Sequence, residues 1–139
     1  MMGLRTATTD DRAALIALLA EAGMDYTDPP EEYILAVEEG TIAGCGRLED
    51  HGHMVMLRPL VVAQPCRGHG VGELILKGIM PADKPTALVA RGEAVAFYKA
   101  MGFSHADWNT IPASQRAECE TCLNRAECQP QPMIHIPVV

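Results

Sequence analysis

This sequence has no excess of basic charge, no long apolar run and no signal-peptide pattern in its first residues, and each of these features narrows the range of expected functions. Its 139 residues include 11 Lys and Arg against 18 Asp and Glu, which gives a formal net charge of -7. A broad surface for nucleic acid or anionic lipid needs clustered basic residues, so neither partner is expected. No apolar run approaches the length of a membrane span, and the N-terminus lacks the basic-then-apolar pattern of a signal peptide. These features predict a cytoplasmic protein.

The composition is that of a folded globular chain. Hydrophobic residues make up 48% and charged residues 21%, far from the low hydrophobicity and high charge of disordered segments. A chain of 139 residues is long enough to bury a core and short enough to form one domain. We therefore expect a single domain over residues 1–139. Either a monomer or a homodimer is compatible with the sequence.

Three of the five cysteines crowd a polar segment near the C-terminus, residues 117–131. In a cytoplasmic chain they are expected to be reduced thiols or metal ligands rather than disulfides. Cys119 and Cys122 have C-x-x-C spacing and Cys128 follows six residues later, which suits three ligands of a zinc or iron–sulfur site. A fourth ligand would come from His135, Cys66 or His105. Free thiols in a polar loop, or a redox pair, fit the same spacing.

Apolar periodicity and turn residues predict strands and helices in an order typical of an α/β protein with a sheet of mixed direction. A turn-rich loop containing Pro30 follows the first helix. One strand contains Pro59, and because proline cannot donate a ladder hydrogen bond, this strand is expected to be an edge or to carry a bulge. The expected elements are strands at 4–8, 33–37, 41–49, 53–62, 86–90, 103–108 and 132–139, helices at 8–23, 71–79 and 92–101, and an irregular segment at 117–131.

A glycine-rich loop, residues 67–72, connects the strand that contains Pro59 to the next helix. At a helix N-terminus, backbone N–H groups converge on one point with the positive end of the helix dipole behind them. Gly68, Gly70 and Gly72 permit positive φ angles and close approach of the backbone, and Arg67 adds a charge-assisted contact. The loop is therefore a candidate phosphate site that functions in an acidic protein. A glycine-rich turn without a ligand is the alternative.

Two other phosphate-binding loops do not fit this segment. A P-loop ends in Gly-Lys-Ser/Thr, whereas Gly72 is followed by Glu73. A dinucleotide fingerprint needs an acidic residue at the end of the next strand, which here ends in Ala90 and Arg91.

The loop and a later helix resemble a known family. Arg67-x-x-Gly70-x-Gly72 after the apolar residues 60–62, together with "AVAFYKAMGF" at 94–103, resembles the two hallmark motifs of the GNAT superfamily of N-acetyltransferases. The resemblance implies the GNAT fold, in which helices flank a mixed, largely antiparallel central sheet, and acetyl-CoA as co-substrate. The segments "GCGRLE", "MLRPLVV" and "DWNTIP" most resemble the short N-acetylglutamate synthase-like acetyltransferases, whose fourth strand carries a bulge near the cofactor and commonly has serine where this chain has Pro59.

The resemblance implies two groups of cofactor-binding residues. The backbone of Leu60, Val61 and Val62 would contact the pantetheine arm of acetyl-CoA. Plain core packing of these apolar side chains is compatible with that role, because the contacts are made by backbone atoms. The pyrophosphate would be bound by Arg67, Gly68, His69, Gly70, Val71 and Gly72.

Three further residues are candidates for the chemistry. Tyr98 matches the family's frequent general acid, which would protonate the departing CoA thiolate, although its place on an apolar helical stripe also suits core packing. Glu49, at a strand end, is the candidate base for the acceptor ammonium, with ordered water as the alternative. Arg58 resembles an arginine that relatives use near an acceptor carboxylate, a task that suits its planar fork, and an ordinary ion pair is the alternative. Arg47 and Arg91 are weaker candidates.

The sequence thus predicts an acetyl-CoA-dependent N-acetyltransferase that acts by direct attack of an amine on the thioester, without a covalent enzyme intermediate. A small glutamate-like amine is the acceptor that the resemblance implies. A non-catalytic acyl-CoA-binding module that senses metal or redox state through its C-terminal cysteines is the alternative function.

Overall fold

The computed structural model describes residues 2–122 and 125–137 of the chain. The strands are β1 (Met2–Thr6), β2 (Tyr33–Glu38), β3 (Thr41–Asp50), β4 (Val55–Val62), β5 (Thr86–Ala90), β6 (Ser104–His105) and β7 (Gln131–His135). The α-helices are α1 (Arg12–Glu21), α2 (Val71–Ile79), α3 (Val95–Ala100), α4 (Ala113–Thr121) and α5 (Arg125–Cys128). Short 3-10 turns are η1 (Thr9–Asp11), η2 (Pro30–Glu32), η3 (Gln64–Cys66), η4 (Gly92–Ala94) and η5 (Trp108–Thr110).

The strands form a seven-stranded sheet in the order β1-β2-β3-β4-β5-β7-β6. The β4–β5 pair is parallel, whereas the pairs β1–β2, β2–β3, β5–β7 and β6–β7 are antiparallel. The expected fold class, a mixed and largely antiparallel sheet with flanking helices, is thereby confirmed. The chain divides into two compact units: residues up to Glu49 with Leu57–Met80, and Asp50–Met56 with the residues from Pro81 onward.

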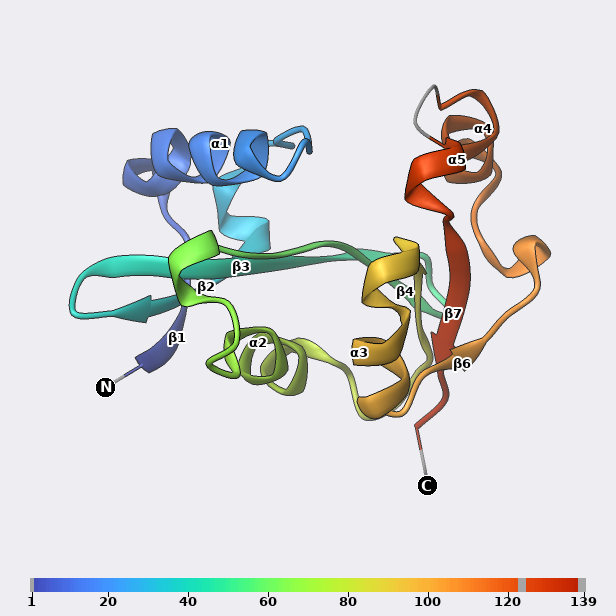
Figure 1. The fold of residues 1–139 in the computed structure, drawn as a ribbon. Coiled ribbons are helices and arrows are strands. Elements are labelled where there is room, and N and C mark those ends of the chain that lie inside the picture. The colour runs from blue at the N-terminus through green and yellow to red at the C-terminus, as the bar shows by residue number, and fades with distance from the viewer. Residues whose placement is uncertain (1, 123–124, 138–139) are drawn as a thin grey trace. The chain divides into compact units, whose positions relative to one another are not determined.

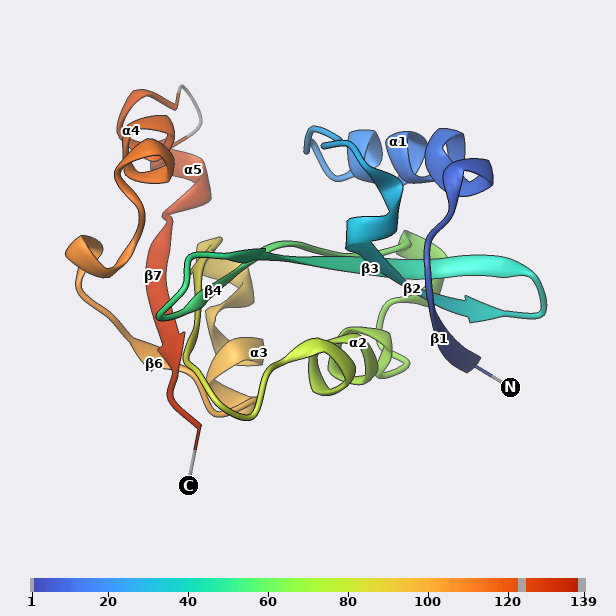
Figure 2. The same cartoon turned by 180° about the vertical axis from the view of Figure 1, so that it is seen from behind.

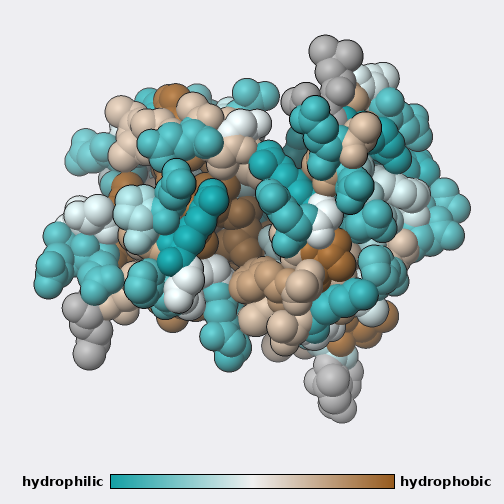
Figure 3. Space-filling view, viewed as in Figure 1, coloured by the Kyte–Doolittle hydropathy of each residue, from teal (hydrophilic) through white to brown (hydrophobic). Residues whose placement is uncertain are grey.

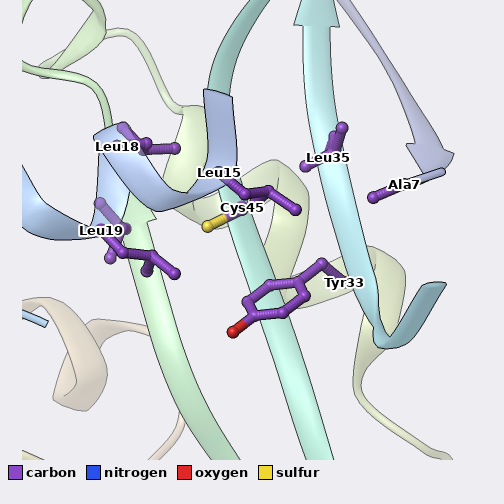
Figure 4. Close-up of a cluster of buried hydrophobic side chains, with 8 residues drawn as sticks. Ala7, Leu15, Leu18, Leu19, Tyr33, Leu35 and Cys45 are labelled. Atoms are coloured by element: carbon purple, nitrogen blue, oxygen red, sulfur yellow. The ribbon is translucent and has the colours of Figure 1, made fainter. Parts of the chain in front are cut away.

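In the first unit, α1 and α2 lie on opposite faces of the strands (Figure 1). The core on the α1 face contains Leu15 and Leu19 of the helix and Tyr33 and Cys45 of the sheet, all fully buried (Figure 4). The Tyr33 hydroxyl accepts a hydrogen bond from the backbone N–H of Thr27 at 3.1 Å, so its one polar atom is satisfied inside this core. The helix begins after η1, where Asp11 accepts the Thr8 N–H at 2.8 Å as part of a capping box.

The α2 face of β3 carries glycines where the helix packs. A Cβ added to Gly44 would lie 2.7 Å from the carbonyl oxygen of Val61, and one added to Gly46 would lie 2.8 Å from Cγ2 of Ile75. Neither position has room for a side chain, since real Cβ contacts are rarely this short. These two glycines let α2 approach the sheet closely, and the position of α2 fixes the glycine loop at its N-terminus.

In the second unit, β5 pairs with β7, and β7 pairs with the two-residue strand β6. Met54, Met56, Ala87 and Ile111 form one buried cluster of this unit. The helices α4 and α5 lie beside each other near the start of β7 (Figure 2). No residue of α4 is buried, and the surface in that region is mostly hydrophilic (Figure 3).

One expectation about the elements was wrong, and one of two alternatives for another is excluded. The segment expected to be irregular contains most of α4 together with α5, although Leu123 and Asn124 of this segment lie outside the described residues, as do Val138 and Val139 of the expected last strand. The strand with Pro59 is not an edge of the sheet, because β4 lies between β3 and β5. Its parallel ladder with β5 consists of Val55 and Met56, however, and does not extend to Pro59. A residue without an N–H is therefore tolerated there.

Candidate functional site

The end of β4 has a hydrogen-bonding side that β5 does not occupy. Within the described residues, the ladder from β4 to β5 ends at Met56. Val61 packs into the core under α1, while Leu60 and Val62 pack on the α2 side. The side chains are thus used for packing on both faces, and the strand can offer its backbone to a ligand. Contact between the backbone of residues 60–62 and a cofactor, which the family resemblance implies, is compatible with this packing and stays a prediction.

The glycine loop leads from β4 through η3 into α2. Gly68 and Gly70 have φ angles of +82° and +78°, a region that glycine adopts without strain. A Cβ added at either position meets no heavy atom within 4 Å. The surface beside the loop backbone is therefore open rather than filled by the protein, as a binding loop requires.

The loop's backbone donors are available for an anion. The helical pattern begins with the Leu74 N–H, which donates to Gly70 at 3.0 Å, so the N–H groups of residues 71–73 at the start of α2 have no acceptor within the helix. The α2 helix spans nine residues, so its dipole adds positive potential at this end. Converging N–H groups at a helix N-terminus fit a pyrophosphate.

Charged side chains around the loop are also compatible with a bound anion. The Nε of Arg67 donates to the carbonyl oxygen of Val62 at 3.4 Å, and its exposed guanidinium stays near the loop. Glu73 in the first turn of α2 would repel an anion, but Lys77 pairs with it at 3.2 Å. The charges beside the loop are therefore compatible with a negative ligand, although the chain as a whole is acidic.

A second group of residues surrounds Arg47 on β3. Its Nη1 donates to Glu49 Oε2 at 2.9 Å and to the carbonyl oxygen of Arg58 at 3.3 Å, and its Nε donates to Glu32 Oε1 at 3.1 Å. Burial of Arg47 disfavours its charged form, but the hydrogen bonds and charges of Glu49 and Glu32 raise the pKa of Arg47 overall. The structure thus brings together Glu49 and the backbone of Arg58, two of the predicted positions.

Arg47 does not suit the role of binding an acceptor carboxylate, for which the sequence made it a weaker candidate. Two carboxylates already neutralise its charge, so an acceptor carboxylate would meet strong repulsion there. Glu32 was not found from the sequence because it lies in the turn-rich loop, where no periodicity marks it. The pairing of Glu32 with Arg47 depends on how η2 meets β3, which the spacing of residues does not show.

Tyr98 lies in the second unit, on α3. Its ring packs edge-to-face against Phe97 at 5.1 Å and against Phe103 at 5.5 Å between centroids. Burial raises the pKa of Tyr98 to about 12, because an apolar environment disfavours the phenolate. The residue therefore occupies a core position, and its phenol stays protonated at neutral pH. Its role as a general acid stays a prediction.

The cysteines do not form a recognisable metal site. Cys119 lies in the last turn of α4, Cys122 follows that helix and Cys128 ends α5. Among residues 2–122 and 125–137, no group of three His, Cys, Asp or Glu side chains is arranged to hold a metal ion. The zinc or iron–sulfur prediction therefore gains no support from the described residues.

Two further residues that the sequence named as candidates are His69 and Arg91. His69 is exposed in the loop, and Arg91 precedes η4 in the second unit. None of the helices in the described part of the chain has the length and apolar character that crossing a membrane requires.

The end of β4, followed by a glycine loop at a helix N-terminus, is compatible with a site for a phosphate-bearing cofactor. Residues 29–105 match the family described as Acetyltransferase (GNAT) domain. The chain belongs to this family of N-acetyltransferases, whose co-substrate is acetyl-CoA, and the resemblance seen in the two sequence motifs is confirmed. No curated protein matches the chain.

Solved structures agree on the fold. N-acetylglutamate synthase from Neisseria gonorrhoeae, complexed with coenzyme A and N-acetyl-glutamate, superposes with a TM-score of 0.76 at 16% identity over 100% of this chain and 36% of that chain. Naa50 from Arabidopsis thaliana, in complex with the bisubstrate analogue CoA-Ac-MVNAL, gives 0.68 at 20% identity over 96% of both chains. A GNAT-family acetyltransferase from Staphylococcus aureus gives 0.71 at 13% identity over 98% of this chain and 99% of that one. The chain thus spans about a third of the length of the gonococcal synthase.

Proposed function

We propose that this protein transfers the acetyl group of acetyl-CoA to the amine of a small acceptor, by direct attack of the amine on the thioester. The observation that carries this proposal is the open glycine loop at the N-terminus of α2 within a GNAT domain. Acetyl-CoA supplies an activated acetyl group and a thiol leaving group. The loop residues Arg67–Gly72 hold its pyrophosphate, and the backbone of Leu60–Val62 holds the pantetheine arm.

The proposed chemistry needs one base and one hydrogen-bond donor. Glu49 takes a proton from the acceptor ammonium, and the freed amine forms the new C–N bond as the C–S bond breaks. The nitrogen then releases its second proton to solvent, which leaves a neutral amide. Backbone N–H groups of Leu60–Val62 stabilise negative charge on the carbonyl oxygen. Arg58 pairs with a carboxylate of the acceptor, for which its planar fork is suited.

Tyr98 acts on the departing sulfur. Its pKa of about 12 lies above the value of about 8.5 for an ordinary thiol. Complete transfer of the phenolic proton to a thiolate is therefore uphill by roughly 5 kcal/mol, since each pKa unit corresponds to about 1.4 kcal/mol. A hydrogen bond donated by Tyr98 in the transition state, with the final proton drawn from solvent, agrees better with this environment.

The acceptor we propose is a glutamate-like amino acid, from resemblance to the N-acetylglutamate synthase-like proteins. Thiol release from acetyl-CoA should be measured with the twenty L-amino acids and with the free-amine peptide Met-Val-Asn-Ala-Leu. We expect L-glutamate or a close analogue to give the highest kcat/KM. A preference for the peptide would contradict the proposed acceptor while keeping the proposed reaction. Measurable acetyl-CoA binding without thiol release for any amine would favour the non-catalytic module instead.

A further inference from the structure

Arg47 is one of two buried charged side chains among the described residues, the other being Asp11. Only 9% of Arg47 is exposed. Burying a guanidinium costs free energy unless its donors and its charge are satisfied. The proposed function assigns Arg47 no role. The contacts of its guanidinium point to one.

The position of Arg47 follows from the pairing of β2 with β3. Cys45, Arg47 and Glu49 alternate along β3 and therefore share one face of the sheet, and Arg47 lies directly opposite Tyr33. Cys45 and Tyr33 are fully buried in the core under α1, whereas the Glu49 side chain is 29% exposed. Arg47 thus stands where the apolar core ends and the charged end of β3 begins.

The guanidinium of Arg47 connects three segments that are distant in sequence. It bonds Glu49 on its own strand, Glu32 in η2, and the backbone carbonyl of Arg58 on β4. Arg58 precedes Pro59, which has no N–H to offer the ladder. A side-chain donor from β3 therefore holds β4 at the residue before Pro59, two residues before the backbone segment Leu60–Val62 that is proposed to bind acetyl-CoA.

We propose that Arg47 is a positioning residue for the acceptor side of this site: its guanidinium holds the Glu49 carboxylate and the β4 backbone at Arg58 at a fixed spacing, and Glu32 anchors the guanidinium. The inference rests on the base role proposed above for Glu49. A base placed about 1 Å too far from the amine can cost about a hundredfold in rate, so a rigid link between β3 and β4 has a direct catalytic consequence.

The experiment compares Arg47→Met, Arg47→Lys and Glu32→Gln, each in the wild-type and in the Glu49→Gln background. The probe is the amine that the panel above identifies as the best acceptor, together with acetyl-CoA. We expect Arg47→Met to lower kcat about 10- to 100-fold with an unchanged dissociation constant for acetyl-CoA. Arg47→Lys should restore part of that loss, because it keeps the charge but not the fork. In the Glu49→Gln background, none of the three changes should lower kcat further.

Two controls separate positioning from general stability. Arg5→Met breaks another arginine–carboxylate pair of the same unit, in which Arg5 bonds Asp11 at 2.8 Å and 2.9 Å, and it should leave kcat unchanged. Hydrogen exchange should show faster exchange in β4 at residues 57–62 for Arg47→Met and not for Arg5→Met. Should Arg47→Met fail to fold, Glu32→Gln still tests the link, because the Glu32 side chain is 46% exposed and its loss should lower kcat severalfold without unfolding.

The outcomes test the positioning role of Arg47 separately from the proposed base role of Glu49. If Glu49→Gln retains full activity, the role of Glu49 is overturned and that of Arg47 falls with it. If Glu49→Gln loses activity while Arg47→Met and Glu32→Gln keep it, only the positioning role is overturned. Equal losses for Arg47→Met in both backgrounds would likewise overturn it, because Arg47 would then act independently of Glu49.

Discussion

At the scale of single residues, the environment of a side chain determines whether it can serve only in packing or also in the chemistry. The sequence identified Tyr98 and Glu49 from motif and strand position, but the partners that shape them come from elsewhere in the chain. Phe103 packs against Tyr98 across the end of α3, and Glu32 reaches Arg47 from a loop. Such contacts depend on the folded positions of two elements, so residue types and spacings alone do not predict them.

Tyr98→Phe tests the donor role. The phenylalanine ring preserves the packing against Phe97 and Phe103, so we expect the free energy of unfolding to change by less than about 1 kcal/mol. The dissociation constant for acetyl-CoA should stay the same, because the proposed hydrogen bond forms only as the C–S bond breaks. Turnover should fall roughly 10²- to 10³-fold, which steady-state kinetics measures. Unaltered turnover would make Tyr98 a core residue alone.

Cys45 makes stability depend on alkaline pH. Burial raises the pKa of its thiol from 9.0 to about 12, so its contribution to stability is complete below pH 9 and is lost as the pH rises from 9 to 12. In this window the unfolded thiol ionises while the folded one does not, which costs about 1.4 kcal/mol per pH unit. Urea unfolding at pH 8, 9, 10 and 11 should show a smaller decline for Cys45→Ala than for wild type. Parallel declines would contradict this burial of the thiol.

At the scale of elements, apolar periodicity was a reliable guide where an element buries one face. The stripe of Val71, Leu74, Ile75 and Ile79 predicted α2 over the residues that form it. Val71 and Ile75 are buried and Ile79 packs against their cluster, whereas Leu74 is 37% exposed. The helix α4 buries no residue, so its sequence carries no such stripe and was expected to be irregular. Apolar periodicity in a sequence arises where one face of an element is buried. A helix that buries no face has no such periodicity and is therefore hard to predict.

The role of the glycine loop can be tested with a control glycine elsewhere in the chain that has the same backbone φ angle. Gly70 and Gly40 share a φ of +78°, and an added Cβ meets no heavy atom within 4 Å at either position. Gly70 lies in the loop and Gly40 in the β2–β3 hairpin. Valine should destabilise the fold at both positions by a similar amount, because both adopt a conformation that β-branched residues rarely adopt.

Only Gly70→Val should abolish acetyl-CoA binding, because its side chain occupies the space that the pyrophosphate needs. Calorimetric titration with acetyl-CoA measures the difference, and we expect Gly40→Val to bind within about twofold of wild type. Equal loss of binding in both variants would show that strain, rather than occupation of the site, is responsible, and unchanged binding in Gly70→Val would remove the assignment of the loop.

At the scale of the whole molecule, the path of the chain links the two compact units. The backbone passes from one unit to the other after Glu49, after Met56 and after Met80, and β4 contributes residues to both. Length alone led to the expectation of one domain, and it could not reveal this division. Neither unit is a continuous segment, so neither can complete its strands without the other part of the chain.

We therefore expect the two units to unfold in one cooperative transition. Trp108, the single tryptophan, belongs to the second unit, and its fluorescence follows the unfolding of that unit. Cys45 is fully buried in the first unit, and its labelling by a thiol reagent, located by mass spectrometry, follows the other. At pH 7 the urea midpoints from the two probes should coincide, because β4 cannot leave one unit while remaining paired in the other. Separate midpoints would show that the units are independent domains and would overturn the expectation of a single domain over residues 1–139.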